Sequence, residues 1–229
     1  MRTSIRAMLF IVLMVASTVA AVAAPAVGDT YVYRVINAYN NEVQGQVTYR
    51  VDKVDAGQVT LSATPDRPAL GMPHTDILAS DANWLRHPLI NHDMPVEYTF
   101  SPPFPAYMAP LDAGKSWSTR VSATDPVSGR RASVRVDADV IGSERITTPA
   151  GAFDTIKVKR RVYAGDWWDA FRNETNIKET EWFAPALGRP VKTDRQSGYI
   201  DQQRCATRLA CTPQRGDWFV YELVSHGRS

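Results

Sequence analysis

Histidines and acidic residues gather in one stretch of the sequence, which makes it the first candidate for chemistry. His74 lies two residues before Asp76, and His87, His92 and Asp93 follow a short distance along the chain. Imidazole and carboxylate groups are ligands that zinc and other divalent cations prefer. Their spacing matches no known metal signature, so ordinary loop polarity is the favoured interpretation. A hydrolase or metal-dependent enzyme that uses the stretch from His74 to Asp93 is the alternative, and no cofactor is expected.

Two pairs of acidic residues share a strand face, because each pair is spaced two positions apart in a stretch of alternating polarity. The pairs are Asp137 with Asp139 and Glu179 with Glu181. A glycosidase needs two carboxyl groups about 5–10 Å apart across a cleft, and neighbours on one strand face meet that distance. Solvated polarity on the sheet is nevertheless favoured, because Asp137 and Asp139 alternate with apolar residues. Motifs of serine hydrolases, zinc proteases and phosphate-binding loops are absent, so we expect no catalytic residue.

Composition and charge exclude several classes of partner. The chain has 229 residues, 26 Lys and Arg, 24 Asp and Glu, and a formal charge of +2. Arg2 and Arg6 account for that surplus, and the rest of the chain is formally neutral. It therefore lacks the basic surface that nucleic acids and anionic membranes attract. One basic run is interpreted as a polar strand face rather than an anion site; it consists of Lys157, Lys159, Arg160 and Arg161.

Aromatic residues concentrate in two segments that break the strand pattern. Residues 95–110 contain five prolines, which lack the donor that a central strand needs, so this segment is expected to be a stiff connection. Residues 165–171 carry further rings among turn-forming residues. Rings exposed at such a lip would bind a lipid chain, an extended peptide, a glycan or an envelope protein; the alternative is that they cover the open end of the sheet. The candidate ligand-binding residues are Tyr98, Phe100, Phe104, Tyr107, Trp167 and Trp168.

The first residues predict export. Residues 1–23 combine a basic start, an apolar middle and an Ala-x-Ala end, as a cleaved signal peptide does, whereas an uncleaved anchor is the alternative. No second apolar run follows, so no membrane span is expected after cleavage, and the location is periplasmic or secreted. In that oxidising compartment, Cys205 and Cys211 are expected to form a disulfide that closes a short local loop.

Alternating polarity dominates residues 24–229, which we expect to form one domain. In the stretch from Val134 to Val140, apolar residues alternate with charged ones, as in half-buried antiparallel strands. Turn signals separate such stretches, and no long segment keeps a helical period. The prediction is a mainly β fold with a curved or half-barrel antiparallel sheet and little helix. A similar glycine-plus-aromatic phrase begins at Gly28, Gly114 and Gly216, which indicates either two related halves, about 28–105 and 114–229, or a chance recurrence.

One longer pattern carries a family resemblance. Residues 148–158 read TPAGAFDTIKV, and residues 181–188 read EWFAPALG, with Val191 following. This pattern resembles that of exported proteins of unknown function grouped as TapB-like or related to them. The resemblance covers residues 110–195 well but the first half of the chain only loosely. The resemblance implies an envelope-targeted antiparallel β-domain, similar to lipoprotein carriers with a curved sheet. It implies no established catalytic residue.

Overall fold

A computed structural model describes residues 25–89, 97–164, 172–201 and 213–228. Within these residues the fold consists of twelve strands and one short 3₁₀ turn, Pro68–Leu70. In chain order the strands are β1 (Thr30–Asn37), β2 (Glu42–Asp55), β3 (Gln58–Pro65), β4 (His74–Ala79), β5 (Trp84–Pro88), β6 (Glu97–Phe104), β7 (Ser116–Thr124), β8 (Arg131–Thr148), β9 (Gly151–Ala164), β10 (Arg172–Ala184), β11 (Arg189–Asp201) and β12 (Pro213–Gly227). No helix of the described residues is long and apolar enough to cross a membrane.

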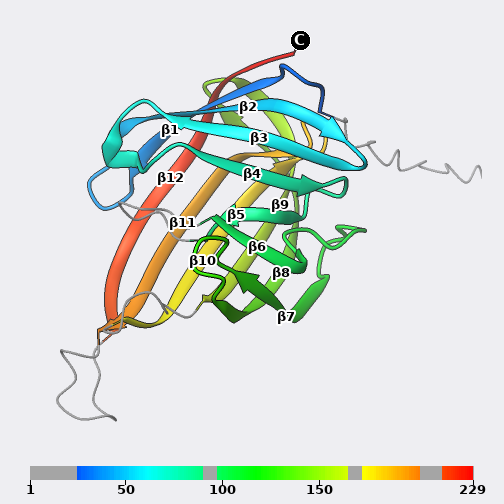
Figure 1. Ribbon diagram of the computed structural model, residues 1–229. Coiled ribbons are helices and arrows are strands. Elements are labelled where there is room, and N and C mark those ends of the chain that lie inside the picture. Colours follow the sequence, from blue (N-terminus) through cyan, green and yellow to red (C-terminus); the bar gives the residue numbers. More distant parts are fainter. Residues whose placement is uncertain (1–24, 90–96, 165–171, 202–212, 229) are drawn as a thin grey trace, which may run out of the picture.

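The twelve strands form a closed barrel in which each strand pairs antiparallel with its neighbours in the sequence (Figure 1). Closure comes from β1, which pairs with β2 on one side and with β12 on the other. The predicted curved or half-barrel sheet is therefore wrong. Alternating polarity reports that each strand has one buried face, but it does not report whether the first and last strands meet.

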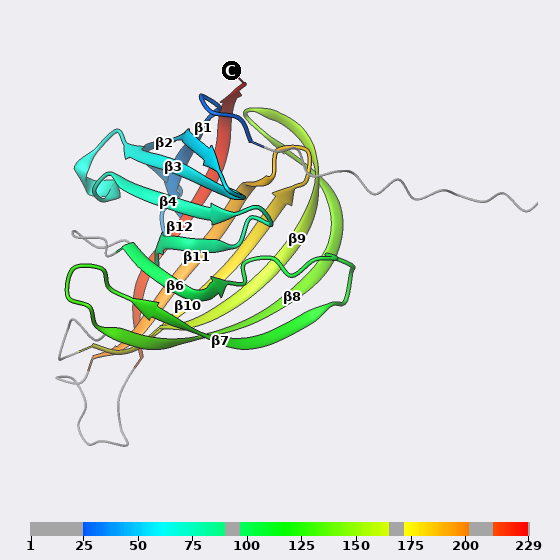
Figure 2. The same ribbon diagram turned by 45° about the vertical axis from the view of Figure 1, so that its right-hand side comes forward.

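The strands differ greatly in length, and this difference shapes the barrel. Strands β8 to β12 are long, whereas β3 to β7 are short. In Figure 2 the long strands β8 to β10 curve around one side, and the short strands β3, β4 and β6 cross the opposite side. Inward-facing side chains of both walls share the interior, which in a barrel of this strand number is wider than in an eight-stranded one.

Two turns show how the sequence joins these strands. The β2–β3 hairpin closes at Ala56 and Gly57, which both have positive φ angles, 47° and 77°. The β8–β9 turn follows Pro149 and places Gly151 at a φ of 131°. Residues with side chains rarely adopt positive φ angles, so Gly57 and Gly151 favour the reversal of the chain at these two turns.

Strand β6 corrects the expectation that residues 95–110 form a connection with exposed rings. Tyr98, Phe100 and Phe104 lie in β6 and are fully buried in the largest apolar cluster of the interior. Prolines are compatible with this strand because its ladder to β7 covers only Thr99 to Ser101, before the first of the two prolines. These rings therefore belong to the core and form no exposed lip.

Candidate functional site

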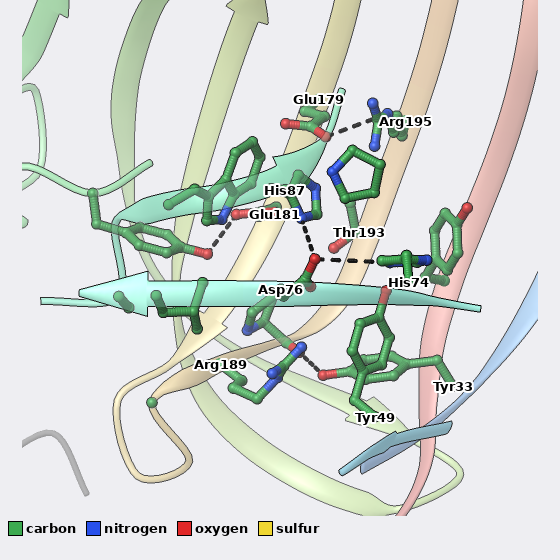
Figure 3. Close-up of a pocket in the computed structure, with 18 residues that line it drawn as sticks. Tyr33, Tyr49, His74, Asp76, His87, Glu179, Glu181, Arg189, Thr193 and Arg195 are labelled. Carbon is green, nitrogen blue, oxygen red and sulfur yellow. Dashed lines mark hydrogen bonds and ion pairs between the residues drawn. The ribbon is translucent and has the colours of Figure 1, made fainter. Parts of the chain in front are cut away.

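A cavity of about 100 Å³ lies inside the barrel and is partly open to solvent. Its lining comes from inward-facing positions of β1, β2, β4, β5 and β10 to β12, together with the segment after β6. Aromatic walls and ionisable groups share this lining, as Figure 3 shows. The aromatic part consists of Tyr33, Tyr49, Trp84, Tyr107 and Tyr221.

Three charged side chains form a row across adjacent strands on the inner wall. Glu179 of β10 lies directly opposite Arg160 of β9 on one side and Arg195 of β11 on the other. Arg160 Nη2 lies 3.1 Å from Glu179 Oε2, and Arg195 Nε lies 3.5 Å from Glu179 Oε1. Burial by itself raises the pKa of the Glu179 carboxyl, but the two guanidinium groups outweigh it and hold the pKa below its usual range. Glu179 therefore stays ionised, which is the condition for this row to hold together.

A second carboxylate completes the charge balance of Arg160. Glu181 Oε2 lies 2.6 Å from Arg160 Nη2 and accepts a hydrogen bond of 2.5 Å from the Tyr107 hydroxyl. Arg160 Nη1 also donates to the Ala106 carbonyl at 2.9 Å. Burial, followed by the charge of Glu181, raises the pKa of Tyr107 well above its usual value, so this hydroxyl keeps its proton and remains a donor. The segment after β6 is thus fixed to the opposite wall through polar groups.

Two histidines bracket a buried aspartate on the facing wall. Asp76 Oδ1 of β4 lies 2.9 Å from His87 Nδ1 of β5 and 3.7 Å from His74 Nε2 (Figure 3). Burial by itself raises the pKa of Asp76. The hydrogen bond and charge of His87, together with His74 and Arg189, outweigh burial, so the pKa lies below its usual value. Burial lowers the pKa of His74, and the attraction of Asp76 only partly opposes this effect.

The structure brings together some of the residues singled out from the sequence. His74, His87 and Tyr107 line the cavity. No group of three or more metal-ligating side chains occurs among the described residues. Several candidates lie outside the described residues, so the disulfide, the exposed tryptophans and half of the histidine-rich stretch stay predictions; these are His92, Asp93, Trp167, Trp168, Cys205 and Cys211.

Sequence reasoning missed the interior charges, although the signal was present in the alternation. Arg160 occupies an inward position between the buried Val158 and Val162, so assigning it to a polar outer face was wrong. Glu179 and Glu181 likewise alternate in step with buried apolar residues of β10. A positive charge in β9 and two negative charges in β10, all at positions of the apolar face, indicate a buried network of ion pairs. The solvated interpretation is correct for the other pair, since Asp137 accepts a hydrogen bond from Ser118 on the outer face.

Comparison with solved structures supports the fold. A protein from Parabacteroides distasonis ATCC 8503, assigned as a lipoprotein, is similar over 89% of this chain and 97% of its own, with a TM-score of 0.55 and 20% identity. A protein assigned as exported, with a YmcC-like fold, from Bacteroides fragilis NCTC 9343 covers the same shares at a TM-score of 0.49 and 18% identity. At these identities the first similarity shows a shared fold and nothing further.

Comparison with families and individual sequences gives no match. No protein-family model matches this chain, and no curated protein matches it. The resemblance to TapB-like proteins is therefore not confirmed.

Proposed function

We propose that this protein is an exported, non-catalytic binding protein of the cell envelope that holds a small ligand inside its barrel. The observation that carries the proposal is the cavity of about 100 Å³, whose lining combines aromatic rings with fixed charges. Ligand cavities commonly combine apolar and aromatic walls with a few polar groups that orient the ligand. The predicted signal peptide and the assignment of the first structural neighbour as a lipoprotein support an envelope location.

The charged lining narrows the kind of ligand. An extended lipid chain requires a long apolar channel, whereas this cavity holds only about 100 Å³ and carries Asp76, Arg189, Glu179 and Glu181 in its walls. Burying a lipid chain against these groups would remove their remaining hydration without replacing it. We therefore infer a ligand of about one ring in size that carries hydrogen-bonding groups.

Trp84 provides the readout for a test. Its ring stacks on Phe104 at 4.4 Å and lies 4.0 Å from the His87 ring, and it lines the cavity. The chain labelled with 5-fluorotryptophan is mixed with low-molecular-weight envelope extracts, and ¹⁹F spectra are recorded; the Trp84 signal is assigned from its loss in Trp84→Phe. We expect the Trp84 signal to shift while that of Trp218, outside the cavity lining, stays in place.

A pair of variants of β4 controls this test. Leu78→Phe adds volume inside the cavity, whereas Ile77→Phe adds the same volume at the neighbouring position, which is not part of the lining. The first variant should abolish the Trp84 shift and the second should keep it. No shift with any extract, together with no small molecule in native mass spectra of the purified protein, would rule out the proposed function.

The Asp76–His87 pair favours one alternative, a hydrolase in which His87 is the general base. An aspartate that accepts from Nδ1 orients an imidazole for that role. Among the described residues, however, no serine, threonine or cysteine side chain is hydrogen-bonded to His87. Loss of a detected esterase or glycosidase activity in His87→Gln, with Trp84 spectra unchanged, would support the enzyme instead.

A further inference from the structure

Arg189 differs from the two other arginines of the cavity region. Arg160 and Arg195 both form ion pairs with carboxylates of β10, whereas Arg189 forms none with any described residue. Its Nε and Nη1 atoms are shielded from solvent and have no hydrogen-bond partner among the described residues. A charged guanidinium with two buried donors that lack a partner is in an unfavourable state.

Aromatic rings hold this guanidinium in place. The Arg189 Cζ lies 4.7 Å from the ring centre of Tyr49 and 5.0 Å from that of Tyr31. The Tyr33 hydroxyl, next to it, donates to the Pro190 carbonyl at 2.7 Å and so fixes the start of β11. Ring contacts of this kind compensate a buried charge only in part, because they do not replace its hydrogen bonds. The rings position the side chain, but Nε and Nη1 have no hydrogen-bond partner among the described residues.

The acidic groups nearby do not fill this role. Asp76 is the carboxylate that acts most strongly on Arg189, but its Oδ1 is bonded to His87 and faces His74. Glu179 and Glu181 are occupied by Arg160. These carboxylates are therefore engaged by other groups, and none of them accepts a hydrogen bond from Nε or Nη1 of Arg189.

His74 presents a second open group at the same end of the cavity. Its Nδ1 lies 3.3 Å from the Met72 carbonyl and therefore donates a proton, which leaves Nε2 as an acceptor in the neutral ring. Nε2 is shielded from solvent and has no hydrogen-bond partner among the described residues. His74 and Arg189 both contact the Tyr49 ring, and Figure 3 shows the three side chains together.

We propose, building on the function proposed above, that the ligand is a small aromatic carboxylic acid whose carboxylate binds Arg189. The ligand carboxylate accepts hydrogen bonds from the Nε and Nη1 donors of Arg189, which have no partner in the protein residues described. The tyrosine and tryptophan walls and the cavity of about 100 Å³ suit one ring. A single negative charge suits the site better than the double charge of a phosphate, because Asp76 and two glutamates lie in the same walls.

The test compares three probes on the full chain at neutral pH and constant ionic strength. Benzoate supplies the ring and the carboxylate, benzyl alcohol supplies the ring without the charge, and inorganic phosphate supplies an anion without the ring. Binding is measured by calorimetry and by the ¹H–¹⁵N resonance of the Arg189 Nε–H group. We expect benzoate to saturate and to shift that resonance, and benzyl alcohol and phosphate to bind at least about tenfold more weakly.

Two variants locate the effect. Arg189→Gln should weaken benzoate binding at least about tenfold, whereas Arg34→Gln, which removes a guanidinium from the outer face of β1, should leave it unchanged. The wild-type comparison of the three probes remains decisive if Arg189→Gln does not fold.

Three results would overturn the inference. They are equal affinity for benzoate and benzyl alcohol, tighter binding of phosphate than of benzoate, and an Arg189 resonance that does not respond to benzoate. None of these results contradicts the proposed binding function. That function is contradicted when envelope extracts leave the Trp84 signal unshifted and native mass spectra show no bound small molecule.

Discussion

The Tyr107 hydroxyl donates a 2.5 Å hydrogen bond to Glu181 Oε2 across the interior of the barrel, although 74 residues separate the two in the sequence. Tyr107 follows β6 and Glu181 lies in β10, so the bond joins the short-stranded wall to the long-stranded one. Both side chains are buried, and both also contact the guanidinium of Arg160. The aromatic core and the charge network thus meet at this bond.

Replacing Tyr107 by Phe should reduce stability measurably. The ring volume is kept, but the buried Glu181 carboxyl loses a hydrogen-bond donor, which we expect to lower the free energy of unfolding by about 1–3 kcal/mol. Tyr39→Phe is the matched control, because its hydroxyl bonds the Gly216 carbonyl at 3.0 Å on the exposed surface. Urea denaturation measures both, and an equal effect of the two variants would contradict the role assigned to the buried bond.

Replacing Arg160 by Met should be far more damaging. Glu179 and Glu181 would be left buried without their shared cation, and breaking a buried pair by removing one partner costs about 3–5 kcal/mol. Arg161→Met changes the next residue, which faces outward, and should alter stability by less than about 0.5 kcal/mol. Adding Glu181→Gln to Arg160→Met should restore part of the loss, and a double-mutant cycle of these two substitutions, measured by urea denaturation, gives their coupling energy.

Replacing Arg189 by Met should have a different outcome from Arg160→Met. Arg189 pairs with no carboxylate among the described residues, so its removal leaves no described carboxylate unpaired. We expect a change in the free energy of unfolding within about 1 kcal/mol, since lost ring contacts oppose the gain from removing an unpaired charge. A loss comparable to that of Arg160→Met would show that Arg189 is a structural residue.

The stability of the protein should fall between pH 6.5 and pH 5. Burial lowers the pKa of His74 from 6.5, so in this range the unfolded chain binds more protons at this residue than the folded one. The free energy of unfolding then decreases as the pH falls and is regained as the pH rises to 6.5. Asp76 and Glu179 have lowered pKa values as well, but their contributions are lost only at lower pH.

His74→Gln should flatten this pH dependence of the melting temperature between pH 5 and 6.5. His226→Gln, at an exposed position near the end of β12, is the control and should leave the slope unchanged. The measurement is differential scanning fluorimetry across the pH series, and an unaltered slope in His74→Gln would assign the effect to another group.

Barrel closure predicts a pattern of hydrogen exchange in β1. Because β1 pairs with both β2 and β12, amides along the whole strand should be protected, including those that point toward β12. In an open sheet, β1 would be an edge and alternate amides would exchange quickly. Exchange measured by NMR on residues such as Arg34 and Val35 distinguishes the two arrangements.

Much of the fold follows from the alternation of side chains. The buried residues of β8 and β9 are those that the period of two assigns to one face, such as Val134, Val136 and Val158. The same period of two places Glu179 on the inner face, whereas the negative charge of its side chain favours a position in solvent. The local pattern decides the direction of a side chain, whereas the burial of a charge depends on a partner strand that supplies the opposite charge.

For the aromatic residues of β6, the local sequence pattern gave the wrong element. The prolines among them argue against a strand, although a proline is excluded only where its nitrogen must donate to a neighbour. Strand β6 has a short ladder, so Phe100 and Phe104 enter the core from a segment that local rules assign to a loop.

The sequence by itself determined the antiparallel β character and the inner face of apolar strand residues such as Val134 and Val158, because these depend on neighbours one or two positions apart. The tertiary structure decided that β1 meets β12, that His74, Asp76 and His87 share one cavity with Glu179 and Glu181, and that two donors of Arg189 have no partner among the described residues. Those relations join residues far apart in the chain. They exist only because closing the barrel brings the inner faces of its two walls together.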